Sequence, residues 1–156
     1  MSTRSFIAIE TDTGYKAIYC HWDGYPSYNG KILAKYYQDK EKVNSLIAHG
    51  DADFIGEKID PDPKYPHSTS LKPGEYQKDV CMFYNRDYGK ELVIHYCKTI
   101  EKLFDQANNS WAEYIYIYRN QLGNDDNHKN NHWDCYEPDM EPSTEFYQML
   151  PSILEE

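Results

Sequence analysis

Three side chains capable of chemistry stand together in residues 18–26, Ile-Tyr-Cys-His-Trp-Asp-Gly-Tyr-Pro. A turn explains the glycine and the proline, but it does not require the imidazole of His21, the indole of Trp22 and the carboxylate of Asp23. Residues two apart on a strand share a face, so His21 and Asp23 point the same way if the preceding strand continues. A carboxylate beside an imidazole orients it for acid–base work. His21 and Asp23 are therefore candidate catalytic residues; the alternative is that Asp23 only caps the turn.

A second segment of similar composition lies near the C-terminus. Residues 132–136 read His-Trp-Asp-Cys-Tyr, and residues 21–25 read His-Trp-Asp-Gly-Tyr. Short matches arise by chance in a chain with 16 tyrosines, so they do not indicate a duplication. On neighbouring strands, Trp22 and Trp133 would flank one pocket, and stacking worth about 1–3 kcal/mol per base would suit a nucleotide. The alternative is that both tryptophans close the core.

Two cationic side chains are candidate phosphate ligands. Arg86 follows an expected strand and could contact a phosphate through two N–H groups. The alternative is an ion pair with Asp87 that stabilises the loop. Lys31 lies where a helix is expected to start, and backbone N–H groups favour anions there. The candidate ligand-binding set is Trp22, Tyr25, Lys31, Arg86, Asp87, Tyr116 and Trp133.

Metal and cofactor motifs are weak in this sequence. His128, His132 and Cys135 have ligand-like spacing, but the Cys-x-x-Cys pair of structural zinc sites is absent. The chain also has no glycine-rich phosphate loop and no serine-hydrolase elbow. We therefore expect no metal and no cofactor, and neither an ATPase nor a dinucleotide oxidoreductase nor a common esterase.

The composition bounds the partners and the compartment. The net charge is −10, and the residues after Lys129 include seven acids and no Lys or Arg. Such a balance argues against direct nucleic-acid binding, which needs a basic surface. The absence of a long apolar run predicts no signal peptide and no membrane contact, so a cytoplasmic protein is expected. Four cysteines without a short paired spacing are expected to be thiols.

The apolar patterns predict strands, helices, strands, one helix and strands, in that order. The chain length of 156 residues fits one domain. We expect an α+β domain over residues 1–137, with a mainly antiparallel sheet and two or three helices on one face. An acidic tail, residues 138–156, follows with one short helix near 146–150. The expected strands are 6–9 with 17–19, 80–84 with 92–96, 114–118 and 132–136; the expected helices are 27–37, 43–50 and 99–107, and 60–73 is an exposed loop.

The chain resembles a family of small phage and bacterial proteins to which no reaction is assigned. The residues that carry this resemblance are Met-Ser-Thr-Arg-Ser-Phe-Ile-Ala-Ile at 1–9 and the segment 18–26. It is strongest over residues 1–56 and returns weakly at 84–89 and 113–118. The family has a Tyr-His-Arg-Asp-like segment where this chain has Asn85 after Tyr84, which weakens any mechanism that needs a second imidazole. The resemblance implies a counter-defence protein in the cytoplasm of a bacterial host.

These observations predict a binding protein that captures a nucleotide-like small ligand or a host defence protein. One alternative is a small hydrolase or phosphodiesterase in which His21, oriented by Asp23, is the acid–base. Another is an acidic mimic whose tail, residues 138–156, blocks a nucleic-acid-binding host protein. An aromatic surface also allows a homodimer.

Overall fold

The structure is a computed structural model that describes residues 2–64, 77, 79–119 and 132–154. In these ranges seven strands form one sheet in the order β4-β3-β2-β1-β6-β7, and β5 pairs with β2 beside β3. Most pairings are antiparallel, whereas β1–β6 and β2–β3 are parallel. The predicted α+β class is therefore confirmed. The strands are β1 (Ser5–Thr11), β2 (Gly14–Cys20), β3 (Ala52–Phe54), β4 (Met82–Phe83), β5 (His95–Cys97), β6 (Tyr114–Arg119) and β7 (His132–Tyr136).

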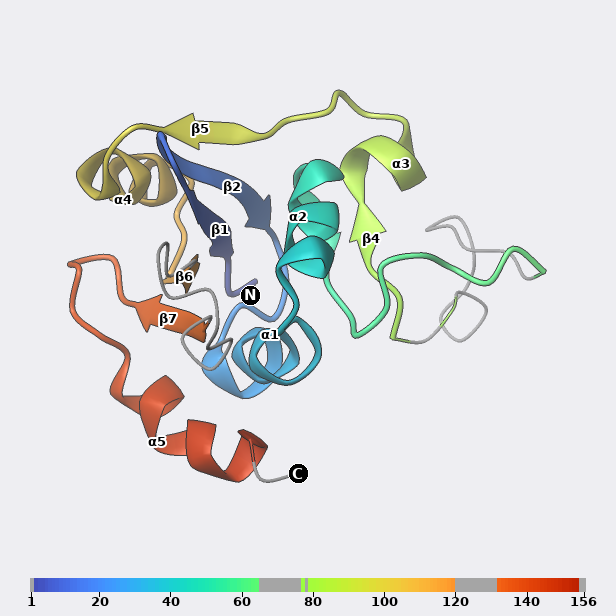
Figure 1. Ribbon diagram of the computed structural model, residues 1–156. Helices are drawn as coiled ribbons and strands as arrows, with labels where there is room; N and C mark the ends of the chain where they lie inside the picture. The colour runs from blue at the N-terminus through green and yellow to red at the C-terminus, as the bar shows by residue number, and fades with distance from the viewer. Residues whose placement is uncertain (1, 65–76, 78, 120–131, 155–156) are drawn as a thin grey trace.

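Helices cover both faces of the sheet, because its central strands are apolar on both sides. On β1, Ile7 and Ile9 join one buried cluster, while Phe6 and Ala8 join another. Figure 1 shows α4 on one side of β1 and β2, and α1 and α2 on the other. The prediction that the helices pack on one face is corrected accordingly. The helices are η1 (Pro26–Gly30, a π-helix), α1 (Lys31–Tyr36), α2 (Lys40–Ala48), α3 (Tyr84–Tyr88), α4 (Ile100–Asn109) and α5 (Thr144–Leu154).

Local sequence explains the elements that were predicted. The β1–β2 hairpin turns at Gly14, whose φ of 144° disfavours any residue with a side chain. The Thr99 hydroxyl caps α4 by accepting a hydrogen bond from the Lys102 backbone N–H at 3.1 Å. In β6, Tyr116 and Ile117 face opposite sides of the sheet and both are fully buried. The phenol face of this strand is therefore part of the core.

The segment from residue 80 to 96 differs from the prediction. The two expected strands do not pair with each other, because β4 pairs with β3 and β5 pairs with β2. The expected linker is instead α3, in which the Asp87 carboxylate accepts the Phe83 backbone N–H at 2.7 Å. Gly89, with φ 69°, ends this helix. Asp87 is thus a capping residue of the helix start.

The C-terminal segment packs onto the domain through α5. Phe146 and Ile153 are buried in the same cluster as α1 and α2, and Glu145 stays exposed. The expected short helix is present and is longer than expected. None of the helices in the described ranges is long and apolar enough to cross a bilayer.

Candidate functional site

The backbone of the first motif, residues 21–25, leaves the sheet by a tight turn. The N–H groups of His21 and Trp22 donate to carbonyl oxygens of the adjacent strand β3, at 3.1 and 2.9 Å. At Asp23 the chain turns with a positive φ of 58°. The next residue, Gly24, donates its N–H to the Thr3 carbonyl, and a Cβ there would lie 2.8 Å from that oxygen. The motif is therefore held at one end of the sheet, beyond the end of β2.

The imidazole of His21 is held by Tyr19, a residue of β2 two positions earlier in the chain. Its Nδ1 lies 2.7 Å from the Tyr19 hydroxyl. Burial raises the pKa of Tyr19, and the nearby Arg4 guanidinium opposes that rise. When the hydroxyl donates to Nδ1, the imidazole carries its proton on Nε2. Within the described residues Nε2 has no hydrogen-bond partner, so it is open to a ligand.

The indole of Trp22 lies directly beside this imidazole. The two rings meet edge to face with their centroids 4.8 Å apart. The Trp22 side chain is nevertheless 41% exposed, a large apolar area to leave in water. We use "His21 end" for the group formed by Arg4, Tyr19, His21 and Trp22.

A second imidazole–carboxylate pair borders the His21 end. The Asp51 carboxylate accepts the Tyr19 backbone N–H at 2.8 Å and lies 3.1 Å from His95 Nε2. The other ring nitrogen of His95 lies 3.4 Å from the Gln106 amide on α4. Since β5 and β3 pair with different parts of β2, Asp51 satisfies a strand N–H left between them.

A further carboxylate nearby is occupied by phenols. Asp53 accepts hydrogen bonds from the hydroxyls of Tyr84 and Tyr88 on α3. Burial raises the pKa of Tyr84 well above its ordinary value, and the charge of Asp53 adds to the rise. The Tyr84 phenol therefore stays protonated and donates to Asp53 at neutral pH.

The predicted pairing of His21 with Asp23 is not what the structure shows. His21 contacts Tyr19, and Asp23 accepts a hydrogen bond from the Tyr25 hydroxyl at 3.2 Å. The turn at Asp23 breaks the strand alternation on which the prediction rested. The residue that orients the imidazole is therefore Tyr19.

Arg86 is engaged inside the protein and is not available to a phosphate. Its Nη1 and Nη2 donate to the carbonyls of Ile59 and Cys81, at 2.8 and 2.9 Å. Its Nε donates to Asp87 at 3.0 Å, and the guanidinium lies over the Phe83 ring. Arg86 therefore stabilises this part of the fold through its contact with Asp87, which was the alternative to phosphate binding.

Three other predicted ligand residues also have different surroundings. Tyr116 and Trp133 are buried, and each donates to a backbone carbonyl, at 2.6 and 2.8 Å. Lys31 is exposed, but its N–H is bonded to η1 carbonyls because the π-helix runs directly into α1. Of the predicted ligand set, Trp22 and Tyr25 lie at the surface within the first motif.

Sequence reasoning missed Tyr19, which contacts His21, together with Arg4 and Asp51, which lie near Tyr19, and His95, which contacts Asp51. Tyr19 lies two positions earlier, on β2, so strand alternation continued one residue past the strand would have placed it beside His21. Arg4, Asp51 and His95 come from other parts of the chain, and no local pattern points to them.

The described residues contain no group of three or more His, Cys, Asp or Glu that could hold a metal ion. His128, one of the three residues whose spacing resembled that of metal ligands, lies outside the described residues. Cys135 is buried.

Comparisons of the chain with protein-family models, with curated proteins and with solved structures found no match. The site is therefore interpreted from its own geometry. The resemblance to small phage proteins stays a prediction.

Proposed function

We propose that this protein captures a small nucleotide-like ligand at the His21 end. The observation that carries the proposal is the open Nε2 of an imidazole held by Tyr19, directly beside the exposed ring of Trp22. An exposed indole offers a stacking face, and an adjacent N–H donor fixes the orientation of whatever stacks there.

The chemistry of this group suits a ring that carries an anion. A base on Trp22 would gain about 1–3 kcal/mol from stacking. His21 Nε2–H would donate to a phosphate or carbonyl oxygen, and Arg4 would supply positive charge in place of Arg86 and Lys31. The carboxylates of Asp51 and Asp53 already accept internal hydrogen bonds, which reduces their repulsion of an anion.

The biological setting of the proposal comes from the resemblance to phage proteins. In a bacterial cytoplasm, capture would withhold a signalling nucleotide from host defence. Capture of a host defence protein instead of a small ligand would leave nucleotides free in the experiment below.

The test is retention of nucleotide second messengers by the purified protein. The protein is incubated with a panel of these compounds and filtered, and bound material is released by heat and identified by mass spectrometry. Trp22→Ala should lower retention about tenfold or more, equivalent to about 1.4 kcal/mol. The matched control is Tyr36→Ala, which removes a similarly exposed ring from α1. Full retention in both Trp22→Ala and His21→Gln would contradict the assignment.

Hydrolysis is a second candidate, favoured by the hydrogen bond between Tyr19 and His21 Nδ1. An imidazole held at one nitrogen and open at the other is arranged as acid–base catalysts are. In the same experiment a cleaved product in the filtrate would support this function. His21→Gln should then abolish cleavage while the intact compound is still retained.

A further inference from the structure

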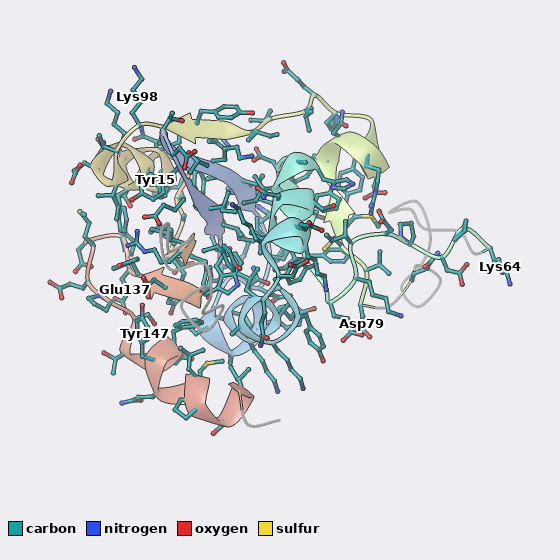
Figure 2. The ribbon with its side chains drawn as sticks, in the orientation of Figure 1. Tyr15, Lys64, Asp79, Lys98, Glu137 and Tyr147 are labelled. Carbon is teal, nitrogen blue, oxygen red and sulfur yellow. The ribbon has the colours of Figure 1, made fainter. Side chains whose placement is uncertain are left out.

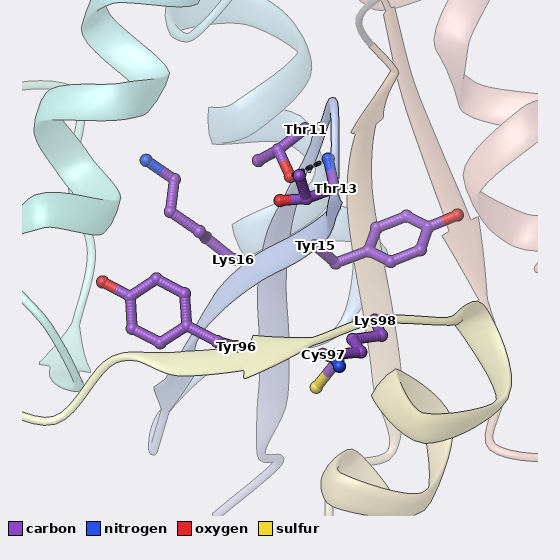
Figure 3. A pocket seen from close by; sticks show the side chains of 7 residues that line it. All are labelled: Thr11, Thr13, Tyr15, Lys16, Tyr96, Cys97 and Lys98. Carbon is purple, nitrogen blue, oxygen red and sulfur yellow. Dashed lines mark hydrogen bonds between the residues drawn. The ribbon is translucent and has the colours of Figure 1, made fainter.

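A pocket of about 450 Å³ lies at the opposite end of β2, where the β1–β2 turn meets β5. Its volume falls within the range of about 300–1,000 Å³ typical of small-ligand sites. Figure 3 shows its lining side chains, which include Lys16 and Tyr96 extending to the same side of the strand pair. The pocket lies six residues before His21 along β2, which corresponds to about 20 Å of extended chain.

Strand register explains how the pocket is assembled. Lys16 pairs directly with Tyr96 across β2 and β5, so the two side chains lie next to each other on one face. The turn is pressed against β5 at Gly14, where a Cβ would overlap the Cys97 carbonyl oxygen. The wall formed by the turn is thus fixed relative to the strand that carries Tyr96.

The charge of the pocket is opposite to that of the chain. Its two charged lining residues are Lys16 on β2 and Lys98 directly after β5, and both are cationic. The chain as a whole carries a net charge of −10. Neither ammonium forms an ion pair within the part of the chain that the structure describes. Two cations that line one cavity favour the binding of an anion there.

Hydroxyl groups and one ring complete the lining. Thr11 Oγ1 accepts the Thr13 backbone N–H at 3.3 Å, which leaves its own hydroxyl proton free to donate. The Tyr96 side chain is 71% exposed and presents its ring beside Lys16. Lysines and threonine hydroxyls are donors to phosphate oxygens, and the phenol ring can cover a planar group.

We propose that this pocket binds a small phosphate-bearing molecule, independently of the His21 end. The ammonium groups of Lys16 and Lys98 hold the phosphate, and the Thr11 and Thr13 hydroxyls donate to it. The Tyr96 ring packs against the organic part of the molecule.

The first experiment measures binding of pyrophosphate to the full chain by isothermal titration calorimetry. Lys16→Gln and Lys98→Gln should each weaken binding about tenfold or more. Lys64→Gln is the charge-matched control, because Lys64 lies on the other side of the molecule from Lys98 (Figure 2). Thermal unfolding of each variant checks that the fold is kept. No binding by the unmodified protein, or an equal loss in Lys64→Gln, would overturn the proposal.

Two further ligands test the organic part. ADP should bind more tightly than pyrophosphate, Tyr96→Ala should remove that difference, and adenosine should bind the pocket weakly. Adenosine binding that depends on Tyr96, in a chain that does not bind pyrophosphate, would contradict a phosphate site.

The proposals for the two sites can be contradicted independently of each other. Trp22→Ala should lose nucleotide capture at the His21 end and keep pyrophosphate binding. If Lys16→Gln/Lys98→Gln lost all nucleotide retention while Trp22→Ala kept it, the pocket would be the nucleotide site and the His21 end would not.

Discussion

Two segments with nearly the same sequence have opposite positions in this protein. In the first motif, residues 21–25, Trp22 is 41% exposed. In the second motif, residues 132–136, Trp133 is 3% exposed and donates its indole N–H to the Tyr37 carbonyl. Composition therefore does not decide whether a His-Trp-Asp segment belongs to a surface site or to the core.

Strand pairing makes the difference. The second motif is β7, which pairs with β6 from Arg119↔His132 to Ile115↔Tyr136. Helix α5 closes its outer side, where Tyr147 donates to Asp134 and accepts the Cys135 N–H. The first motif begins where β2 ends and leaves the sheet after two backbone hydrogen bonds. Its indole therefore stays 41% exposed.

The largest expected contrast is between the two tryptophans. Trp133→Ala removes a buried ring and its hydrogen bond, and should lower the free energy of unfolding by about 3–5 kcal/mol. Trp22→Ala removes a half-exposed ring and should lower it by less than about 1 kcal/mol. Urea unfolding followed by circular dichroism measures both. Equal losses would mean that the two motifs are buried alike.

The same contrast shows what could be predicted from sequence. Local patterns were sufficient for the hairpin of β1 and β2, for β6 and for the Thr99 cap, because these depend on neighbouring residues. The burial of Trp133 depends on Tyr37, 96 residues away, and the Asp51–His95 contact spans 44 residues. Such contacts follow from strand order, which periodicity does not specify.

The side chain predicted to contact His21 was Asp23, and that contact is absent: His21 contacts Tyr19 and Asp23 contacts Tyr25. Residues 18–26 contain His21 and Trp22, which lie together in the structure. The prediction assumed that β2 continues through Asp23, but the chain turns there with a positive φ. A single backbone angle thus separates the expected pair from the observed one.

The fourth position, Gly24 in one motif and Cys135 in the other, tests how tightly the first turn is packed. A Cβ at Gly24 would lie 2.8 Å from both the Ser5 Cβ and the Thr3 carbonyl oxygen. Gly24→Ala should therefore lower the free energy of unfolding by about 1–3 kcal/mol. Thermal unfolding measures the loss. Gly89→Ala is the comparison variant, because a Cβ there meets no atom within 4 Å and any loss comes from the positive φ instead of from crowding. A neutral Gly24→Ala would mean that this end of the sheet adjusts freely.

The two motifs are alike in one respect: each has a buried cysteine in it or directly before it, and the stability of the protein at alkaline pH tests that burial. Cys20 just before the first motif and Cys135 within the second are both buried, and burial raises the pKa of each from 9.0 to about 12. The unfolded chain ionises first, so the stability from each neutral thiol is full below pH 9.0 and is lost as the pH rises toward 12.

Replacing either thiol should flatten this alkaline loss. Cys20→Ala and Cys135→Ala should each reduce its slope by up to about 1.4 kcal/mol per pH unit, measured by urea unfolding between neutral and alkaline pH. Cys97→Ala should change the slope less, because that thiol is only partly buried. An unchanged slope in both buried variants would show that these thiols are hydrated in the folded state.

The smallest expected effect separates the two possible partners of His21. Asp23→Gly suits the positive φ of 58° and removes only an exposed hydrogen bond from Tyr25. The free energy of unfolding should therefore change by less than about 1 kcal/mol, and ligand retention should stay as it was. Tyr19→Phe removes the hydroxyl that holds His21 Nδ1, so it should lower retention severalfold with little loss of packing. If Asp23→Gly lowered retention and Tyr19→Phe did not, the carboxylate of the turn would orient the imidazole when ligand is bound, and the resting contact with Tyr19 would be incidental.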